Sequence, residues 1–260
     1  MSRYRKPALA AAFAGLVAFA APAFAADMGS DDTLSTAAGD MKIHAFHHAS
    51  LSLSWGGTTV LVDPAPMMGG APAADPSAEF KSAAANPDLI LITHEHPDHF
   101  NPDILFAVAG DKTTIVAPQD VVDKLPEGLK GKAKALANGE TAMLANVSIM
   151  AVPAYNSTED RTKFHPKGRG DNGYVLTIGD KHVYIAGDTE DTPEMRALTG
   201  IDAAFVPMNL PYTMDVQHAA DAVKAFRPKV VYPYHYSGSD LEAFKEAVGD
   251  AAEVRLLKWY

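Results

Sequence analysis

Short apolar runs separated by turn residues recur along the chain and predict a strand-rich domain. The glycine pair Gly56-Gly57 marks a turn between two of the early runs. Strands are expected at residues 42–46, 49–55, 58–64, 88–93, 113–118, 133–137, 141–144, 147–152, 174–179, 182–188, 201–208 and 229–235. The Gly179-Asp180 pair predicts a hairpin between the segments at 174–179 and 182–188.

Helices are predicted between these strands, where capping residues or a 3.6-residue apolar period occur. Asn101 before Pro102 and Thr192 before Pro193 are typical helix starts, and residues 119–125 form another short helix. A longer amphipathic helix is indicated by apolar residues at Val216, Ala219, Ala220, Val223 and Phe226. Ser239 and Glu242 have the spacing of a capping box for a last helix. Strand-rich halves that each end in helices predict two sheets packed face to face, an α/β or α+β domain.

The first residues follow a different pattern, that of a secretory signal. A positively charged start precedes an apolar stretch from Ala8 to Ala21, and Ala23-Phe24-Ala25 supplies an A-x-A cleavage site. The apolar stretch is shorter than the roughly 20 residues that a membrane span needs. We therefore expect a signal peptide over 1–25, a flexible lead over 26–41 and a single domain over 42–260. This arrangement predicts a periplasmic or secreted protein without stable membrane insertion after cleavage.

Charge and cysteine content narrow the chemistry. The formal net charge of -10 argues against nonspecific nucleic-acid binding and favours a small-molecule enzyme or a binding protein. The 260 residues include no cysteine, so disulfides and thiolate metal ligands are excluded. Any metal ion must then be held by histidine, aspartate, glutamate or water.

The densest group of such ligands lies at 93–100, THEHPDHF, directly after an apolar strand. It contains His94, His96, Asp98 and His99. Imidazole nitrogen and carboxylate oxygen are the usual ligands of zinc and similar divalent ions. The segment therefore predicts a metal centre, whereas a capping turn with surface histidines would not explain four candidate ligands in six residues.

Three further candidate ligands lie at strand ends. Asp188 follows VYIAG, His235 follows KVVYPY, and His48 lies beside His47 between the first two strands. Alternation along a strand directs His47 and His48 to opposite faces, so only one can face the site. A helix cap for Asp188 and an ordinary strand-end histidine for His235 are the simpler interpretations of these residues taken singly.

Together these motifs resemble the metallo-β-lactamase-fold hydrolase superfamily. The pattern H-x-H-x-D-H matches residues 94–99, a Gly-Asp motif matches Gly187-Asp188, and a closing histidine matches His235. FHHASLSLSWGGTTVLVDP and IAGDTE are most similar to the branch of ascorbate-6-phosphate lactonase and N-acylphosphatidylethanolamine phospholipase D. The resemblance implies an α+β fold, a four-layer αβ/βα sandwich, and a metal-dependent hydrolase. His48 and Asp63-Pro64 match the early motif of that branch.

The resemblance also implies a ligand set and a mechanism. His94 and His96 would hold one ion, Asp98, His99 and His235 a second, and Asp188 would bridge them. The cofactor would be one or two divalent ions, foremost zinc. A metal-bound hydroxide would attack an ester, lactone, amide or phosphodiester, with Asp98 and Asp188 as candidates for orienting the water and transferring its proton.

One position departs from the family pattern. The third histidine of the first ion is expected at the end of AVPAYN, where Ala154 stands. Three outcomes are open: His165 reaches back as a substitute, Asn156 or water fills the position, or the first ion is weak or absent and the centre is mononuclear.

The loop RTKFHPKGRGDNG is basic in an otherwise acidic chain. Its cations are either an ordinary solvated charge run or a rim that attracts an anionic small-molecule substrate: Arg161, Lys163, Lys167 and Arg169. Two other functions remain alternatives to the hydrolase. One is a non-catalytic metal- or partner-binding protein, favoured by Ala154, and the other is a β-lactamase, disfavoured by the missing histidine and the closer lactonase likeness.

Overall fold

The structure, a computed structural model, describes Met1, residues 30–66 and residues 73–260. The predicted signal peptide, apart from Met1, and the start of the predicted lead lie outside the described residues. Within the described residues no helix combines the length and the apolar character needed to cross a membrane.

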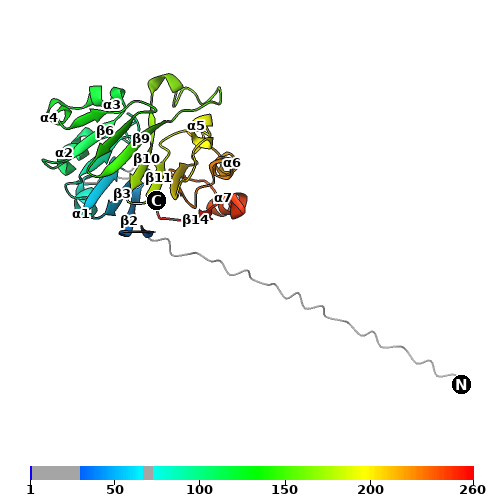
Figure 1. The fold of residues 1–260 in the computed structure, drawn as a ribbon. Coiled ribbons are helices and arrows are strands. Elements are labelled where there is room, and N and C mark those ends of the chain that lie inside the picture. The colour runs from blue at the N-terminus through cyan, green and yellow to red at the C-terminus, as the bar shows by residue number, and fades with distance from the viewer. Residues whose placement is uncertain (2–29, 67–72) are drawn as a thin grey trace.

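Two seven-stranded sheets form the centre of the domain (Figure 1). The first sheet follows chain order, β1-β2-β3-β4-β5-β6-β7, with antiparallel pairing from β1 to β4 and parallel pairing from β4 to β7. Its strands are β1 Asp31–Thr36, β2 Gly39–His47, β3 Ser50–Trp55, β4 Thr58–Val62, β5 Leu89–Leu91, β6 Thr114–Ala117 and β7 Ala133–Ala135.

The second sheet has the matching order β14-β13-β12-β11-β10-β9-β8. Its antiparallel part runs from β8 to β11 and its parallel part from β11 to β14. The strands are β8 Thr141–Leu144, β9 Val147–Pro153, β10 Asn172–Ile178, β11 Lys181–Ile185, β12 Ala203–Pro207, β13 Val230–Tyr234 and β14 Glu253–Val254. In both sheets the carboxyl ends of the parallel strands lie at one edge of the sheet. Side chains that follow these ends can bind a ligand without breaking the hydrogen bonds between strands.

Helices cover the outer faces of both sheets, which completes the four layers (Figure 1). The first sheet is covered by α1 Ala78–Ala83, α2 Pro102–Val108, α3 Gln119–Lys124 and α4 Glu127–Lys130. The second is covered by α5 Pro193–Arg196, α6 Val216–Phe226 and α7 Leu241–Val248. Short 3-10 turns also occur at Lys167–Arg169 and Gly249–Ala251. The predicted αβ/βα sandwich is confirmed.

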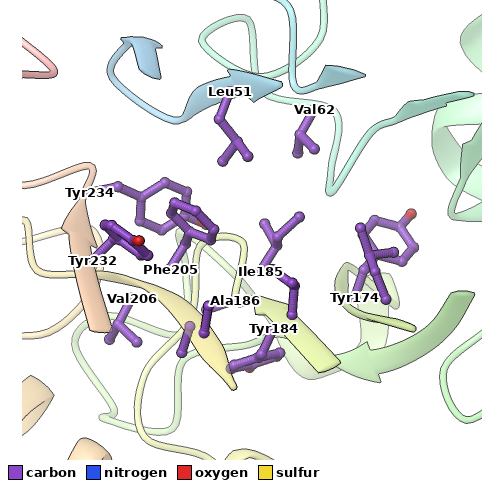
Figure 2. Packing of buried hydrophobic residues seen from close by; sticks show 14 of the residues in the cluster. Leu51, Val62, Tyr174, Tyr184, Ile185, Ala186, Phe205, Val206, Tyr232 and Tyr234 are labelled. Carbon is purple, nitrogen blue, oxygen red and sulfur yellow. The ribbon is translucent and has the colours of Figure 1, made fainter. Parts of the chain in front are cut away.

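The main core lies between the two sheets. Leu51 and Val62 of the first sheet point toward Ile185, Phe205 and Tyr234 of the second, and all five are 0% exposed (Figure 2). Burial of each such side chain contributes about 1.5–3 kcal/mol of transfer free energy. The rigid sandwich gives the strand ends, and the side chains that follow them, fixed positions.

Residues 31–36 correct the predicted flexible lead, because they form β1 at the edge of the first sheet. The strand pairs antiparallel with β2, and its Asp32 accepts hydrogen bonds from the Tyr232 hydroxyl at 2.7 Å and from Arg255 at 3.2 Å. Leu34 is the one aliphatic residue in the strand. The apolar pattern is therefore too weak to predict it, and distant partners hold it in place.

The start of α7 also differs from the prediction. Asp240, not Ser239, caps the helix, and its side chain accepts a hydrogen bond from the Ala243 N–H at 3.0 Å. The Ser239 hydroxyl instead donates to the carbonyl of Met208. A tertiary contact thus takes the serine away from the capping role that its spacing indicates.

Candidate metal centre

The segment after β5 places its ligands on one tight turn. The N–H groups of His99 and Phe100 both donate to the carbonyl of His96, at 2.9 and 2.8 Å. Asn101 then caps α2 by accepting from the Ile104 N–H at 3.0 Å, with Pro102 at the first helical position as predicted. This turn brings the histidines of the segment close to His165 and Asp188, which follow strands of the second sheet.

One group of ligands consists of three histidines. Nδ1 of His96 lies 3.1 Å from Nε2 of His94 and 3.2 Å from Nε2 of His165. These three nitrogens lie within 4.8 Å of one another and could hold one ion. Of the outcomes left open by Ala154, the structure brings His165 to the group, from the loop between β9 and β10.

Asn156 holds the loop that carries His165. Its side-chain N–H donates to the carbonyls of Tyr212 at 2.7 Å and Arg161 at 3.1 Å, and its backbone N–H donates to the carbonyl of His165 at 2.8 Å. Nδ1 of His165 also lies 3.1 Å from the Tyr212 carbonyl. That contact favours a proton on Nδ1 and so leaves the Nε2 lone pair for the group.

A second group contains Asp98, His99, His235 and His48, whose candidate atoms also lie within 4.8 Å of one another. Oδ2 of Asp98 is 3.8 Å from Nε2 of His235 and 4.0 Å from Nε2 of His99. Each of the parallel strands β5 and β13 therefore contributes its following loop to the same group, as the strand-end pattern predicted.

Asp188 lies between the two groups. Its carboxylate oxygens are 3.4 Å from Nε2 of His99, 3.2 Å from Nε2 of His235 and 3.4 Å from Nε2 of His165. A carboxylate in contact with both groups has the placement that a bridging ligand needs.

The residue before Asp188 has to be glycine. Gly187 has φ +68°, and an added Cβ would lie 2.9 Å from the carbonyl oxygen of Asn172 and 3.2 Å from Cβ of Thr93. Its N–H donates to the Tyr234 hydroxyl at 2.8 Å. The close approach of three strand ends at this point brings the Asp188 side chain to the site.

Asp63 orients His99 and was recognised in the sequence only as part of a motif. Its Oδ2 accepts from Nδ1 of His99 at 2.8 Å, while its two oxygens accept from the N–H and hydroxyl of Thr93 at 2.8 and 2.7 Å. A carboxylate behind a histidine fixes the ring and its tautomer, which leaves Nε2 free to bind a metal ion. Its position at the end of a buried strand was the signal for this role.

His48, and not His47, faces the centre. Nε2 of His48 lies 3.0 Å from Oδ2 of Asp98, and its Nδ1 lies 2.9 Å from the hydroxyl of Tyr260. His47 points away, with Nε2 2.7 Å from the Ala65 carbonyl and Nδ1 3.1 Å from Glu79. The left-handed backbone of His48, φ 55°, turns its side chain toward the site at the end of β2.

Several buried polar atoms of these groups have no hydrogen-bond partner among the described residues. They are Nε2 of His99, Nε2 of His235 and Oδ1 of Asp188. A buried polar atom left without a partner typically loses about 1–3 kcal/mol, so such atoms seldom converge without a reason. The donor set and its geometry fit a divalent cation bound among nitrogen and carboxylate ligands.

The charges of the site agree with that fit. Burial lowers the pKa of His94 well below its ordinary value and that of His165 to about 4, which keeps both rings neutral and able to bind a metal. Burial also opposes a charge on His235, but Asp188 and Asp98 outweigh it and raise its pKa to about 10. The two carboxylates thus stabilise positive charge at the middle of the site.

A pocket of about 400 Å³ opens onto these ligands. Six of the predicted site residues line it: His48, His96, Asp98, His165, Asp188 and His235. A pocket of similar size, about 390 Å³, lies on the outer face of the second sheet, with His182 as its one titratable lining residue. The lining residues distinguish these two pockets. The pocket at the ligand groups has the side chains needed for metal binding or acid–base catalysis, and the pocket at His182 does not.

The cations of the basic loop do not form the predicted free positive rim. Arg161 pairs with Glu190 at 2.8 Å, Lys167 with Glu194 at 3.2 Å, and Arg169 with Asp171 at 2.7 Å. Lys163 lies 5.1 Å from the ring centre of Phe164 and has no ion pair among the described residues. Carboxylates distant in sequence or buried nearby neutralise three of the four cations, which sequence patterning could not reveal.

Comparison with known proteins agrees with this geometry. The family described as the beta-lactamase superfamily domain matches residues 42–235. A protein of Thermococcus onnurineus described as a metal-dependent hydrolase is 35% identical over 228 residues, which cover 84% of this chain and 96% of that protein. A similarly described protein of Pyrococcus abyssi is 33% identical over the same shares of the two chains.

Solved structures give the same result. A crystal structure from Parabacteroides distasonis, assigned as a metal-dependent hydrolase, has a TM-score of 0.77 at 40% identity and covers 88% of this chain and 99% of that one. Igni18, described as a metallo hydrolase of the archaeon Ignicoccus hospitalis, has a TM-score of 0.67 at 26% identity, covering 84% and 95%.

Proposed function

This chain belongs to the beta-lactamase superfamily, among relatives described as metal-dependent hydrolases, and we propose that it binds two divalent ions and hydrolyses an ester, lactone, amide or phosphodiester bond of a small molecule. The proposed ions are zinc, because imidazole nitrogen and carboxylate oxygen dominate the ligand set. His94, His96 and His165 would hold one ion, Asp98, His99 and His235 the other, and Asp188 would contact both.

The observation that carries this proposal is the convergence of three buried, unpartnered atoms around Asp188. They are Nε2 of His99, Nε2 of His235 and Oδ1 of Asp188, and they belong to three separate segments of the chain. Buried polar atoms without hydrogen-bond partners are rare in folded proteins, so three of them close together indicate a bound ligand. Bound divalent ions would satisfy these atoms.

The ions, when bound, would lower the pKa of a water molecule toward about 7 and polarise the group under attack. The chain's own residues would place the reactants. Asp98 and Asp188 both line the pocket, so either carboxylate can accept a hydrogen bond from a water molecule there and orient it. Burial raises the pKa of Asp98, but the nearby His235 ring and the hydrogen bond with His48 outweigh burial and keep that pKa well below its ordinary value.

The proposal is tested with the full chain after metal removal and reloading with zinc. We expect turnover of at least one substrate class among p-nitrophenyl esters, lactones, bis(p-nitrophenyl) phosphate and nitrocefin, and its loss on adding a chelator. Asp188→Asn keeps the size of the side chain and should lower kcat by about 100-fold or more. Asp221→Asn, at an exposed position of α6, is the matched control and should retain activity.

Two results would contradict the proposal. One is turnover that persists in the metal-free protein or in Asp188→Asn. The other is tight zinc binding without turnover of any substrate class, which would favour a non-catalytic metal-binding protein instead.

We also propose that the protein acts outside the cytoplasm, on the strength of the signal-like segment at 1–25. N-terminal sequencing of the protein from cell fractions tests this. A mature chain that starts at Ala26 in the periplasm or medium is expected, and an intact start in the cytosol would contradict it.

A further inference from the structure

The large apolar side chains that are exposed on the described chain are not scattered evenly. Tyr212 and Tyr260, 45% and 42% exposed, both line the pocket of the candidate metal centre. Leu210, 51% exposed, belongs to the same short segment as Tyr212. Exposed apolar groups that gather at one place usually contact a ligand or a partner, whereas single ones need no explanation.

Packing gives this aromatic surface a defined shape. The rings of Phe164 and Tyr212 meet edge to face with centroids 5.1 Å apart, so the β9–β10 loop and the segment before α6 form one wall. Tyr260 packs edge to face on Tyr236 at 5.1 Å and is also held by its hydroxyl contact with His48. Phe164, Tyr212 and Tyr260, called the aromatic wall below, are therefore positioned by neighbours before any ligand arrives.

Few of the chain's own cations reach the pocket lining. The lining residues include no lysine or arginine, and Arg161 and Lys167 in the neighbouring loop are paired with carboxylates. Arg169 is paired with Asp171 and also lies 3.0 Å from Nε2 of His96, while Lys163 lies over the Phe164 ring. The chain carries a formal net charge of -10, which repels anions at long range. Apart from the metal ligands, the wall offers a substrate apolar contact.

We propose that the aromatic wall binds the apolar acyl or aryl group of an ester, amide or lactone and so selects substrates that carry a large apolar group over those that lack one. This inference rests on the proposed hydrolase function for its kinetic consequence. The wall lies in the same pocket as Asp98 and Asp188, so a substrate held there by its apolar group places its reactive bond near the ligands.

The kinetic test uses the zinc-loaded full chain with p-nitrophenyl acetate, butyrate and hexanoate, which share one leaving group. We expect kcat/KM to rise about tenfold or more from acetate to hexanoate, because each added methylene leaves water. Tyr212→Ala should reduce that ratio about threefold or more, and Tyr212→Phe should restore it. Met143→Ala, which removes another exposed side chain outside this pocket, should leave the ratio unchanged.

A binding measurement keeps the inference testable if no ester is hydrolysed. Saturation-transfer NMR with 4-phenylbutan-2-one, a neutral ketone that cannot be hydrolysed, should show binding that Tyr212→Ala weakens and Tyr212→Phe retains. Absence of turnover with retained ketone binding would overturn the proposed function and leave the aromatic wall supported. A hexanoate-to-acetate ratio near one, or no ketone binding, would overturn the aromatic wall itself.

Discussion

Nε2 of His165 lies 3.2 Å from Nδ1 of His96, although 69 residues separate them in the sequence. The contact places a histidine where the family pattern leaves Ala154. The Tyr212 carbonyl holds the ring in this position, because it lies 3.1 Å from Nδ1 of His165 and accepts a hydrogen bond from the Asn156 side chain at 2.7 Å. The first ion therefore has three imidazole candidates, like the more usual sites of this kind.

Replacing His165 should remove about one of two bound ions per chain, because His94 and His96 alone leave that ion with too few ligands. Zinc content of the desalted His165→Ala protein, measured by elemental analysis, checks this. His182→Ala, which removes a histidine outside both ligand groups, should keep the full content. Equal zinc content in the His165→Ala protein and the parent protein would refute the ligand role.

His48 can act on Asp98 in two ways, as its hydrogen-bond donor or as a ligand itself, and metal binding distinguishes them. If it donates, His48→Ala should weaken zinc affinity about 10–100-fold without changing the number of ions. If it is a ligand, an ion should be lost. Competition against a chromophoric chelator measures both quantities.

His47→Ala is the matched control for this experiment, because the neighbouring ring points to the Ala65 carbonyl and Glu79 and away from the centre. It should lower stability and leave zinc affinity unchanged. The same loss of affinity in both variants would show a general effect of the β2–β3 turn.

Gly187→Ala should destabilise the protein by about 2 kcal/mol or more, through a left-handed backbone and a clash together. An added Cβ there would meet the Asn172 carbonyl at 2.9 Å. Gly139→Ala separates the two causes, since Gly139 has φ +84° with nothing within 4 Å of the added Cβ, and should cost about 1–2 kcal/mol. Urea unfolding of both variants measures the difference, and equal costs would remove the clash from the explanation.

The Asp32 carboxylate should make the attachment of β1 depend on pH. Burial raises its pKa, but hydrogen bonds from Tyr232, from the Thr33 N–H and from Arg255 outweigh burial and hold it below the ordinary 3.8. A lowered folded-state pKa adds stability that is complete above about 3.8 and is lost as pH falls through the folded value.

Asp32→Asn should therefore cost about 0.5–1 kcal/mol at pH 7, because the group is partly exposed and solvent-screened, and less near pH 2. Chemical unfolding at both pH values checks the prediction, with Asp40→Asn on β2 as an exposed control. If Asp32→Asn lowers the free energy of unfolding equally at both pH values, the shape of the side chain, and not its charge, holds β1.

The sequence by itself determined the ligands that lie close together in the chain. Four of them occur within residues 94–99, where one turn must bring them together, and Asp188 and His235 follow apolar strands whose ends a sandwich places side by side. Local spacing and strand patterning are short-range properties, so they can be recognised without knowing the packing. The layered fold follows from the same patterning.

Tertiary structure alone decided the choices that depend on distant partners. Tyr212 orients His165, the turn after β2 selects His48 over His47, and Glu190 neutralises Arg161. Pairing with β2, together with the contacts of Asp32, makes an ordered strand of a segment with almost no apolar pattern. In each case the deciding contact joins residues that only packing brings together, and its geometry is not encoded in the local spacing of the residues themselves.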